Sequence, residues 1–151
     1  DYYFTNKSVD NDEVIKLDGV QELLEKLNKS NVLMGLVTGN LEPIGRCKLE
    51  QVGLNHYFKV GGFGSDDMDR ANLVKLAIKK AKENFDFKPE NNVFLFGDTP
   101  LDVKAGKEGG VKTIGVATGD YSKEQLESAG ADFVLENLED TGKILKIIFG
   151  K

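Results

Sequence analysis

The sequence is poor in the residues that build several common kinds of site. It has one cysteine, Cys47, and one histidine, His56, among 151 residues. A single cysteine cannot form an intramolecular disulfide, which indicates a reducing compartment, the cytoplasm. A single histidine excludes sites with several histidine ligands and disfavours a Ser-His-Asp triad. We therefore expect Cys47 to be a small core residue on the inward face of a helix, and His56 to have a packing role only.

Long apolar runs, an excess of basic residues and a P-loop are also missing. No run approaches the roughly 20 apolar residues that a membrane-spanning helix needs, so no membrane partner is expected. The 20 Lys and Arg are outnumbered by 25 Asp and Glu, which gives a net charge of −5 and disfavours a nucleic-acid partner. Since no G-x-x-x-x-G-K-[ST] run occurs, a P-loop NTPase is excluded.

Apolar runs alternate with amphipathic segments along most of the chain. Strands are expected at 32–37, 57–60, 92–96, 112–116 and 132–135, and helices at 20–27, 42–52, 71–84, 100–108, from 122 on and at 138–149. The clearest strands are apolar throughout, which is typical of strands buried on both faces. The alternation predicts an α/β fold with a doubly wound parallel sheet. A loop is expected at 61–65.

Polar residues follow the first clear strand at Thr38-Gly39-Asn40. In open α/β sheets, ligands bind at the carboxyl ends of the strands, so this is a place where a site is expected. The Thr38 hydroxyl could bind a phosphate at the start of the next helix, and Gly39, which has no side chain, would let the phosphate come close to the backbone. The alternative is a plain strand-to-helix turn in which Thr38 or Asn40 caps the helix.

Two carboxylates follow the second clear strand, at Asp98 and Asp102. Their spacing lets both face one crevice if Asp98 leaves the strand and Asp102 lies in the first turn of the helix. Because two carboxylates at one site repel, a hard divalent cation, typically Mg²⁺, would be expected between them. The alternative is that Asp98 or Thr99 caps the helix and Asp102 stabilises its positive end.

Three stretches resemble the haloacid dehalogenase superfamily of phosphohydrolases, in its phosphoglycolate-phosphatase-like branch with a helical cap. They are LVTGN, FGSDDMDRANLVKLA and VFLFGDTPLDVKAGKEGGVKTIGVATG. The resemblance extends from about Lys16 to Leu145, and the GDTPLD run in its strand-to-helix context is the most specific part. It implies a Rossmann-like core of the haloacid dehalogenase type.

The resemblance also implies a role for each matching residue. Thr38 matches the second motif, whose hydroxyl binds the transferring phosphoryl group, and Asn40 lies in the same loop. Asp98 matches the fourth-motif acid that coordinates Mg²⁺, and Asp102 matches its acidic companion. Arg70 is the candidate for the third-motif cation.

The third-motif assignment departs from the family's usual pattern. Most relatives have Lys at this point, followed by Pro, and this chain has neither there. Lys59 and Lys75 are weaker alternatives to Arg70, and a solvated or salt-bridged surface role is the structural alternative for Arg70 itself.

The family's first motif, D-x-D-x-T, is absent. The run at residues 1–5, DYYFT, has Tyr3 where the second Asp belongs and no strand before it, so we do not accept it as the motif. We therefore expect residues 1–15 to be a return segment from a missing cap, and residues 16–151 to be a core without its first, central strand. Two half-sheets with unpaired edges would result, open to a missing N-terminal segment or another copy of the chain.

The expected function is Mg²⁺-dependent hydrolysis of a small phosphorylated metabolite through an aspartyl-phosphate. Since the nucleophile is absent, the chain is expected to be inactive as given. A phosphosugar mutase of the same superfamily and a non-catalytic phosphate-binding fragment are the alternatives. A receiver-type signalling domain is disfavoured, because it needs its acidic pair and phospho-accepting Asp before its Thr, whereas Thr38 here precedes Asp98.

Overall fold

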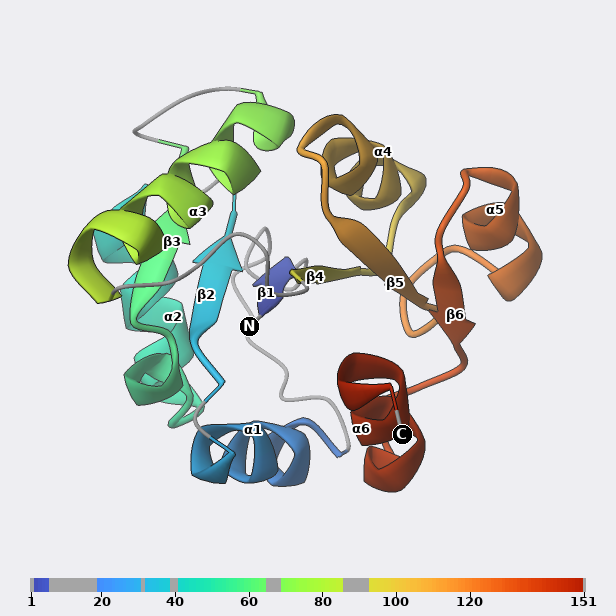
Figure 1. The fold of residues 1–151 in the computed structure, drawn as a ribbon, viewed down its shortest axis with the longest axis horizontal. Coiled ribbons are helices and arrows are strands. Elements are labelled where there is room, and N and C mark those ends of the chain that lie inside the picture. Colours follow the sequence, from blue (N-terminus) through green and yellow to red (C-terminus); the bar gives the residue numbers. More distant parts are fainter. Residues whose placement is uncertain are drawn as a thin grey trace.

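The computed structural model describes residues 19–30, 32–38, 41–64, 69–85 and 93–150, and the backbone of residues 2–5. They form one six-stranded sheet with the order β3-β2-β1-β4-β5-β6, and every neighbouring pair is parallel. Helices cover both faces of this sheet (Figure 1). The predicted doubly wound parallel α/β fold is confirmed. None of the described helices is long and apolar enough to cross a membrane.

Most elements lie where the sequence pattern predicts them. The strands are β1 Tyr2–Thr5, β2 Met34–Val37, β3 Val60–Gly62, β4 Phe94–Gly97, β5 Lys112–Val116 and β6 Phe133–Leu135. The helices are α1 Val20–Lys29, α2 Glu42–Gln51, α3 Arg70–Phe85, α4 Pro100–Glu108, α5 Lys123–Ser128 and α6 Thr141–Phe149, with a 3₁₀ turn at Asn55–Tyr57.

Two apolar cores lie on opposite faces of the sheet, because successive strand residues point to opposite faces. In β4, Phe94 and Phe96 belong to one core and Leu95 to the other. The first core contains the buried residues of α1 and α6, and the second contains those of α3. Both faces of β4 are therefore buried, which explains its continuous apolar sequence.

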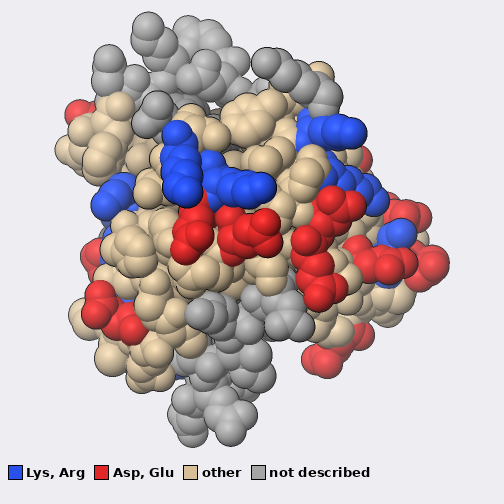
Figure 2. All heavy atoms as spheres, turned by 90° about the horizontal axis from the view of Figure 1, so that it is seen from below, with Lys and Arg blue, Asp and Glu red and all other residues tan. Residues whose placement is uncertain are grey.

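Helix α1 shows how the apolar spacing positions one of these layers. Val20, Leu23, Leu24 and Leu27 are buried on one side, as the spacing of i, i+3, i+4 and i+7 predicts. Each buried leucine contributes about 1.5–3 kcal/mol relative to an exposed one. Figure 2, which views the molecule from the side of α1 and α6, shows basic side chains bordering acidic ones across the middle of this face.

Helix α2 overturns the prediction for Cys47. Only Gly45 and Leu49 are buried in this helix, and Cys47 is exposed. Cys47 lies two positions from each of them, and a two-residue step turns about 200° around a helix, away from the buried side. The expectation that Cys47 is a core residue was therefore wrong.

The third strand lies later in the chain than predicted. The expected strand at 57–60 is mostly a 3₁₀ turn and a connection, and β3 includes Gly61 and Gly62, which were expected in a loop. A Cβ on Gly62 would lie 2.3 Å from the Leu73 carbonyl oxygen of α3. Glycine is thus needed for close packing of strand and helix here. His56 is exposed, although its ring lies against that of Tyr57, with 4.1 Å between the centroids.

Strand β1 overturns the expectation of a divided sheet. It pairs in parallel with β2 on one side and β4 on the other, so it occupies the central position that was expected to be vacant. The prediction of two half-sheets with unpaired inner edges was wrong. The residues of β1 have high β-propensity, and the inner backbone groups of β2 and β4 would otherwise lack partners. Residues 6–18, which include most of the predicted return segment, lie outside the described part of the chain.

Candidate functional site

The predicted site residues gather at one edge of the sheet. Thr38 directly follows β2, and Asp98 directly follows β4. Because both strands run parallel to β1 and flank it, their carboxyl ends lie at the same edge. Since β1 lies between them, the ends of β2 and β4 are two strand spacings apart, which is about 9–10 Å. The carboxyl ends of β2, β1 and β4 therefore lie side by side at this edge.

The turn from β4 into α4 is held by a capping box. Thr99 is the N-cap, and its hydroxyl accepts a hydrogen bond from the Asp102 backbone N–H at 3.1 Å. The Asp102 carboxylate in turn accepts hydrogen bonds from the backbone N–H groups of Asp98 at 3.2 Å and Thr99 at 3.3 Å. The expected structural role, in which Thr99 caps α4 and Asp102 stabilises the start of that helix, is thus present in the fold. The same hydrogen bonds hold the backbone of Asp98 in place.

Gly97 lets this turn pack against the end of the strand. A Cβ built on Gly97 would lie 2.3 Å from the Cβ of Asp102. At this distance the two Cβ atoms would overlap, so any side chain at position 97 would displace Asp102. The position of Asp102 therefore requires a glycine before Asp98.

Arg70 meets Asp102 from a different helix. It is the first residue of α3, and its Nη1 donates a short hydrogen bond to Oδ1 of Asp102. Asp102 is 1% exposed, so its charge requires a partner in the interior. The sequence placed Arg70 at this site but did not indicate its contact with Asp102. The alternatives Lys59 and Lys75 are both exposed.

Gly119 belongs to the same site, although sequence reasoning did not select it. A Cβ on Gly119 would lie 2.6 Å from Oδ2 of Asp98, so the loop after β5 forms one wall of a cradle for this carboxylate. Oδ1 of Asp98 is also buried. Gly119 lies in the IGVATG run that carries the resemblance, but no spacing within the chain indicates its contact with Asp98.

Thr38 is 2% exposed and lies next to α2. Its backbone N–H donates to the Gly62 carbonyl at 3.1 Å, and a Cβ on Gly45 would lie 3.5 Å from its methyl group. The N-cap of α2 is Leu41, so Thr38 does not serve as the helix cap that the structural alternative suggested. Gly39 and Asn40 lie outside the described part of the chain.

The arrangement suits a magnesium ion at Asp98 better than at Asp102. Mg²⁺ is commonly bound by one or two carboxylates with substrate phosphate and water completing its shell. Asp98 offers hard oxygen atoms in the Gly119 cradle. Both carboxylate oxygens of Asp102 accept hydrogen bonds, from Arg70 and from two backbone N–H groups. Among the described residues there is no group of three or more His, Cys, Asp or Glu that could hold a metal by itself.

The central strand brings no carboxylate to this edge. The four residues of β1, at Tyr2–Thr5, contain neither Asp nor Glu. Asp1 precedes the strand and lies outside the described residues. A nucleophilic Asp between the ends of β2 and β4 is therefore missing from the strand that occupies this position.

Comparisons with known proteins show relatives of this chain in both sequence and fold. Pyrophosphatase PpaX from Anoxybacillus flavithermus is 30% identical over 89% of this chain, and phosphoglycolate phosphatase from Vibrio parahaemolyticus is 27% identical over 85%. The crystal structure of a hydrolase from Pseudomonas syringae is 27% identical, with a TM-score of 0.73 over 89% of this chain and 63% of its own. The crystal structure of a Thermotoga maritima protein named as a candidate beta-phosphoglucomutase is 26% identical. It has a TM-score of 0.72 over 87% of this chain and 60% of its own.

The matches extend along most of this chain but only part of its relatives. The chain spans 61% of the PpaX sequence and 55% of the phosphoglycolate phosphatase sequence. The model of one family, the haloacid dehalogenase-like hydrolases, matches residues 2–116. That range contains Thr38, Arg70, Asp98 and Asp102, which the fold assembles at one edge of the sheet. The chain belongs to the haloacid dehalogenase-like hydrolase family.

Proposed function

We propose that the chain forms most of the core of a Mg²⁺-dependent phosphomonoester hydrolase that acts on a small phosphorylated metabolite. The observation that carries this proposal is the Arg70–Asp102 ion pair beside Asp98, at the sheet edge that also ends in Thr38. Such an arrangement offers a fixed cation, a hydroxyl and a metal-binding carboxylate around one space. Phosphoryl transfer depends mainly on positioning and charge stabilisation of this kind.

Each residue has a separate role in the proposed site. Thr38, with the backbone of Gly39 and Asn40, binds the phosphoryl oxygens. Arg70 places positive charge near the phosphate, and Asp102 acts as a positioning residue that fixes Arg70 and the turn carrying Asp98. This differs from the sequence-based expectation that Asp102 binds the metal, since both of its oxygens have other partners.

Asp98 would hold Mg²⁺ in the cradle beside Gly119. When bound there, the ion would neutralise part of the charge of the phosphoryl group. The nucleophilic Asp, on which an aspartyl-phosphate would form, is not among the four residues of β1. We therefore propose that the chain is inactive alone and that, in a complete enzyme of the cytoplasm, a strand carrying D-x-D-x-T takes the central position that β1 holds here and supplies the nucleophile.

A phosphosugar mutase is the second candidate. It is favoured by the Thermotoga maritima structure, which is as similar to this chain as the hydrolase structures are. The two activities share the phosphate and metal groups described above. The residues that direct the phosphoryl group to water or to a sugar would lie on the nucleophile strand and the cap.

Hydrolysis of an aryl phosphate with Mg²⁺ tests the proposal. The 151-residue chain should show no turnover above that of its Asp98→Asn variant, whereas a longer protein that adds a D-x-D-x-T strand should hydrolyse the substrate. In that longer protein Asp98→Asn should abolish turnover, and Glu108→Gln, an exposed control on α4, should leave it unchanged. Robust turnover by the 151-residue chain would contradict the proposal.

A further inference from the structure

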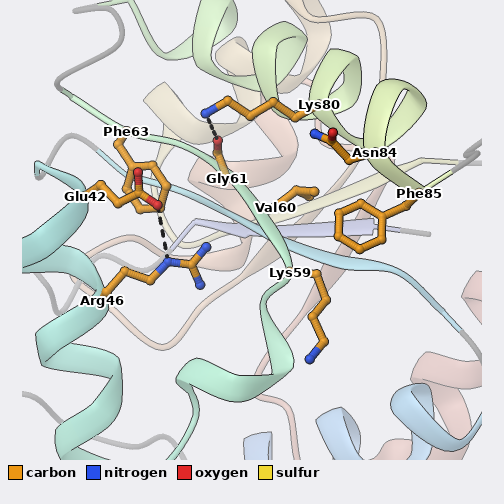
Figure 3. A pocket seen from close by; sticks show the side chains of 9 residues that line it. All are labelled: Glu42, Arg46, Lys59, Val60, Gly61, Phe63, Lys80, Asn84 and Phe85. Atoms are coloured by element: carbon orange, nitrogen blue, oxygen red, sulfur yellow. Dashed lines mark hydrogen bonds and ion pairs between the residues drawn. The ribbon is translucent and has the colours of Figure 1, made fainter.

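A pocket of about 280 Å³ lies at the outer edge of the sheet, between α2, β3 and α3. Figure 3 shows that its side chains come from all three elements. The candidate phosphate site involves the ends of β2 and β4, and none of Thr38, Arg70, Asp98 and Asp102 lines this pocket. The pocket is slightly smaller than the roughly 300–1,000 Å³ typical of sites for drug-sized ligands. It would therefore suit a small molecule.

Arg46 is held rigidly at this pocket. Its Nη1 donates hydrogen bonds to the Phe58 carbonyl at 2.6 Å and to Oδ1 of Asn55 at 3.1 Å, and its Nε lies 3.6 Å from Oε2 of Glu42. Its guanidinium carbon is 5.5 Å from the centroid of the Phe63 ring. These contacts fix the guanidinium without using Nη2. Such a preorganised cation loses little entropy when it binds an anion.

Two lysines add positive charge around the same space. Lys80 donates a hydrogen bond to the Gly61 carbonyl at 3.0 Å. Lys59 is exposed, and its side-chain ammonium makes no hydrogen bond or ion pair with a described residue. Of the described residues that line the pocket, Glu42 alone carries a carboxylate, and it already contacts Arg46. The described lining of the pocket thus has three basic side chains and one acidic one, whereas the whole chain has a net charge of −5. The pocket therefore favours an anion.

An aromatic surface adjoins these cations. Phe85, at the end of α3, lines the pocket and is 47% exposed, and Phe63 lies beneath Arg46. A flat apolar ligand group could cover Phe85 and gain from both burial and stacking.

Protection of the sheet edge explains only part of this arrangement. β3 is an edge strand, and lysines near such edges discourage pairing with other chains. The Lys80 contact with Gly61 fits that role. Protection of the edge accounts neither for the fixed guanidinium of Arg46 nor for the exposed ring of Phe85.

We propose that this pocket binds a small organic anion with one planar apolar ring. The ring lies against Phe85, and the anionic group lies between Arg46 and Lys59. The site is separate from the proposed phosphate site, so its occupancy does not depend on Mg²⁺ or on Asp98.

Titration of the 151-residue chain with benzenesulfonate, followed by the amide resonances of the protein, tests the proposal. Saturable shifts are expected at Lys59–Gly62 and Asn84–Phe85, with no dependence on Mg²⁺. Sodium sulfate should bind more weakly because it lacks the ring, and benzyl alcohol because it lacks the charge. Lys59→Gln should weaken binding about three- to fivefold, and Phe85→Ala about three- to tenfold.

Matched variants serve as controls. Lys79→Gln removes the charge of an exposed lysine outside the pocket, and Phe149→Ala removes a similarly exposed ring on α6; neither should change the affinity. Three results would overturn the proposal: no shifts at these amides up to about 10 mM benzenesulfonate, equal binding of sulfate or benzyl alcohol, or equal losses in the control variants.

Discussion

Two strand-to-helix turns lie at the same edge of the sheet and are built in different ways. The turn from β4 to α4 has a side-chain cap, a glycine that admits close packing and an ion pair with α3. In the described part of the turn from β2 to α2, the N-cap residue is Leu41, which makes no side-chain cap. Local structure thus explains Thr99 and Asp102 fully, whereas helix capping does not explain the polar Thr38. This difference is what would be expected if one turn serves as a rigid support and the other as a ligand contact.

The largest expected effect comes from removing the carboxylate of the supporting turn. Asp102→Ala should lower the free energy of unfolding by about 3–5 kcal/mol, because it leaves Arg70 partly buried without its partner and removes two backbone hydrogen bonds. Chemical denaturation measures the change. Asp102→Asn, which keeps an oxygen acceptor for the cap, should cost less. A loss below about 1 kcal/mol for Asp102→Ala would contradict the supporting role.

Overpacking the same turn should have the next largest effect. Gly97→Ala places a Cβ against the Cβ of Asp102 and should cost about 1–3 kcal/mol in a denaturant titration. Gly142→Ala, in the open first turn of α6, is the matched control and should be neutral or slightly stabilising. If both variants were equally stable, the close approach at Gly97 would be ruled out.

Loss of the cap itself should be milder. Thr99→Ala should destabilise the protein by about 1 kcal/mol, since the Asp102 backbone N–H then lacks its side-chain acceptor. Thermal unfolding measures the difference, and Thr99→Ser should retain most of the stability. Equal losses in the two variants would show that packing of the methyl group, rather than the cap, matters.

The smallest effect should be a gain at the other turn. Leu41 is exposed at the N-cap position of α2, so Leu41→Ser should supply the missing side-chain cap and stabilise the protein by about 0.5–1 kcal/mol. Leu101→Ser replaces another exposed leucine, which lies inside α4, and should bring no gain. A loss of stability in Leu41→Ser would show that the apolar side chain has a packing role.

Local patterns in the sequence predicted local structure well. The apolar stripe of α1 lies where the sequence places it, and the helix expected from 122 on is α5, with Ser122 as its N-cap. Contacts between distant segments were not predictable in the same way. Arg70 and Asp102 are 32 residues apart and meet only because α3 packs against α4, and Gly119 reaches Asp98 only through the sheet order.

The errors have a similar origin. A strand of four residues such as β1 is too short to show a period within a polar stretch, and its place depends on the unpaired backbone of its neighbours. Two adjacent glycines in β3 have the composition of a loop, but close packing against α3 makes them part of the sheet. Tertiary packing decided both cases.

In the site that we propose, Thr38 and Asp98 bind phosphate and Mg²⁺ while the β4–α4 turn supports them. Calorimetric titration of the 151-residue chain with inorganic phosphate, with and without Mg²⁺, tests it most directly. We predict binding that requires Mg²⁺, is lost in Asp98→Asn, falls at least about tenfold in Thr38→Val and is unchanged in Glu108→Gln. Equal phosphate binding by the wild-type chain and the Asp98→Asn variant would contradict the account.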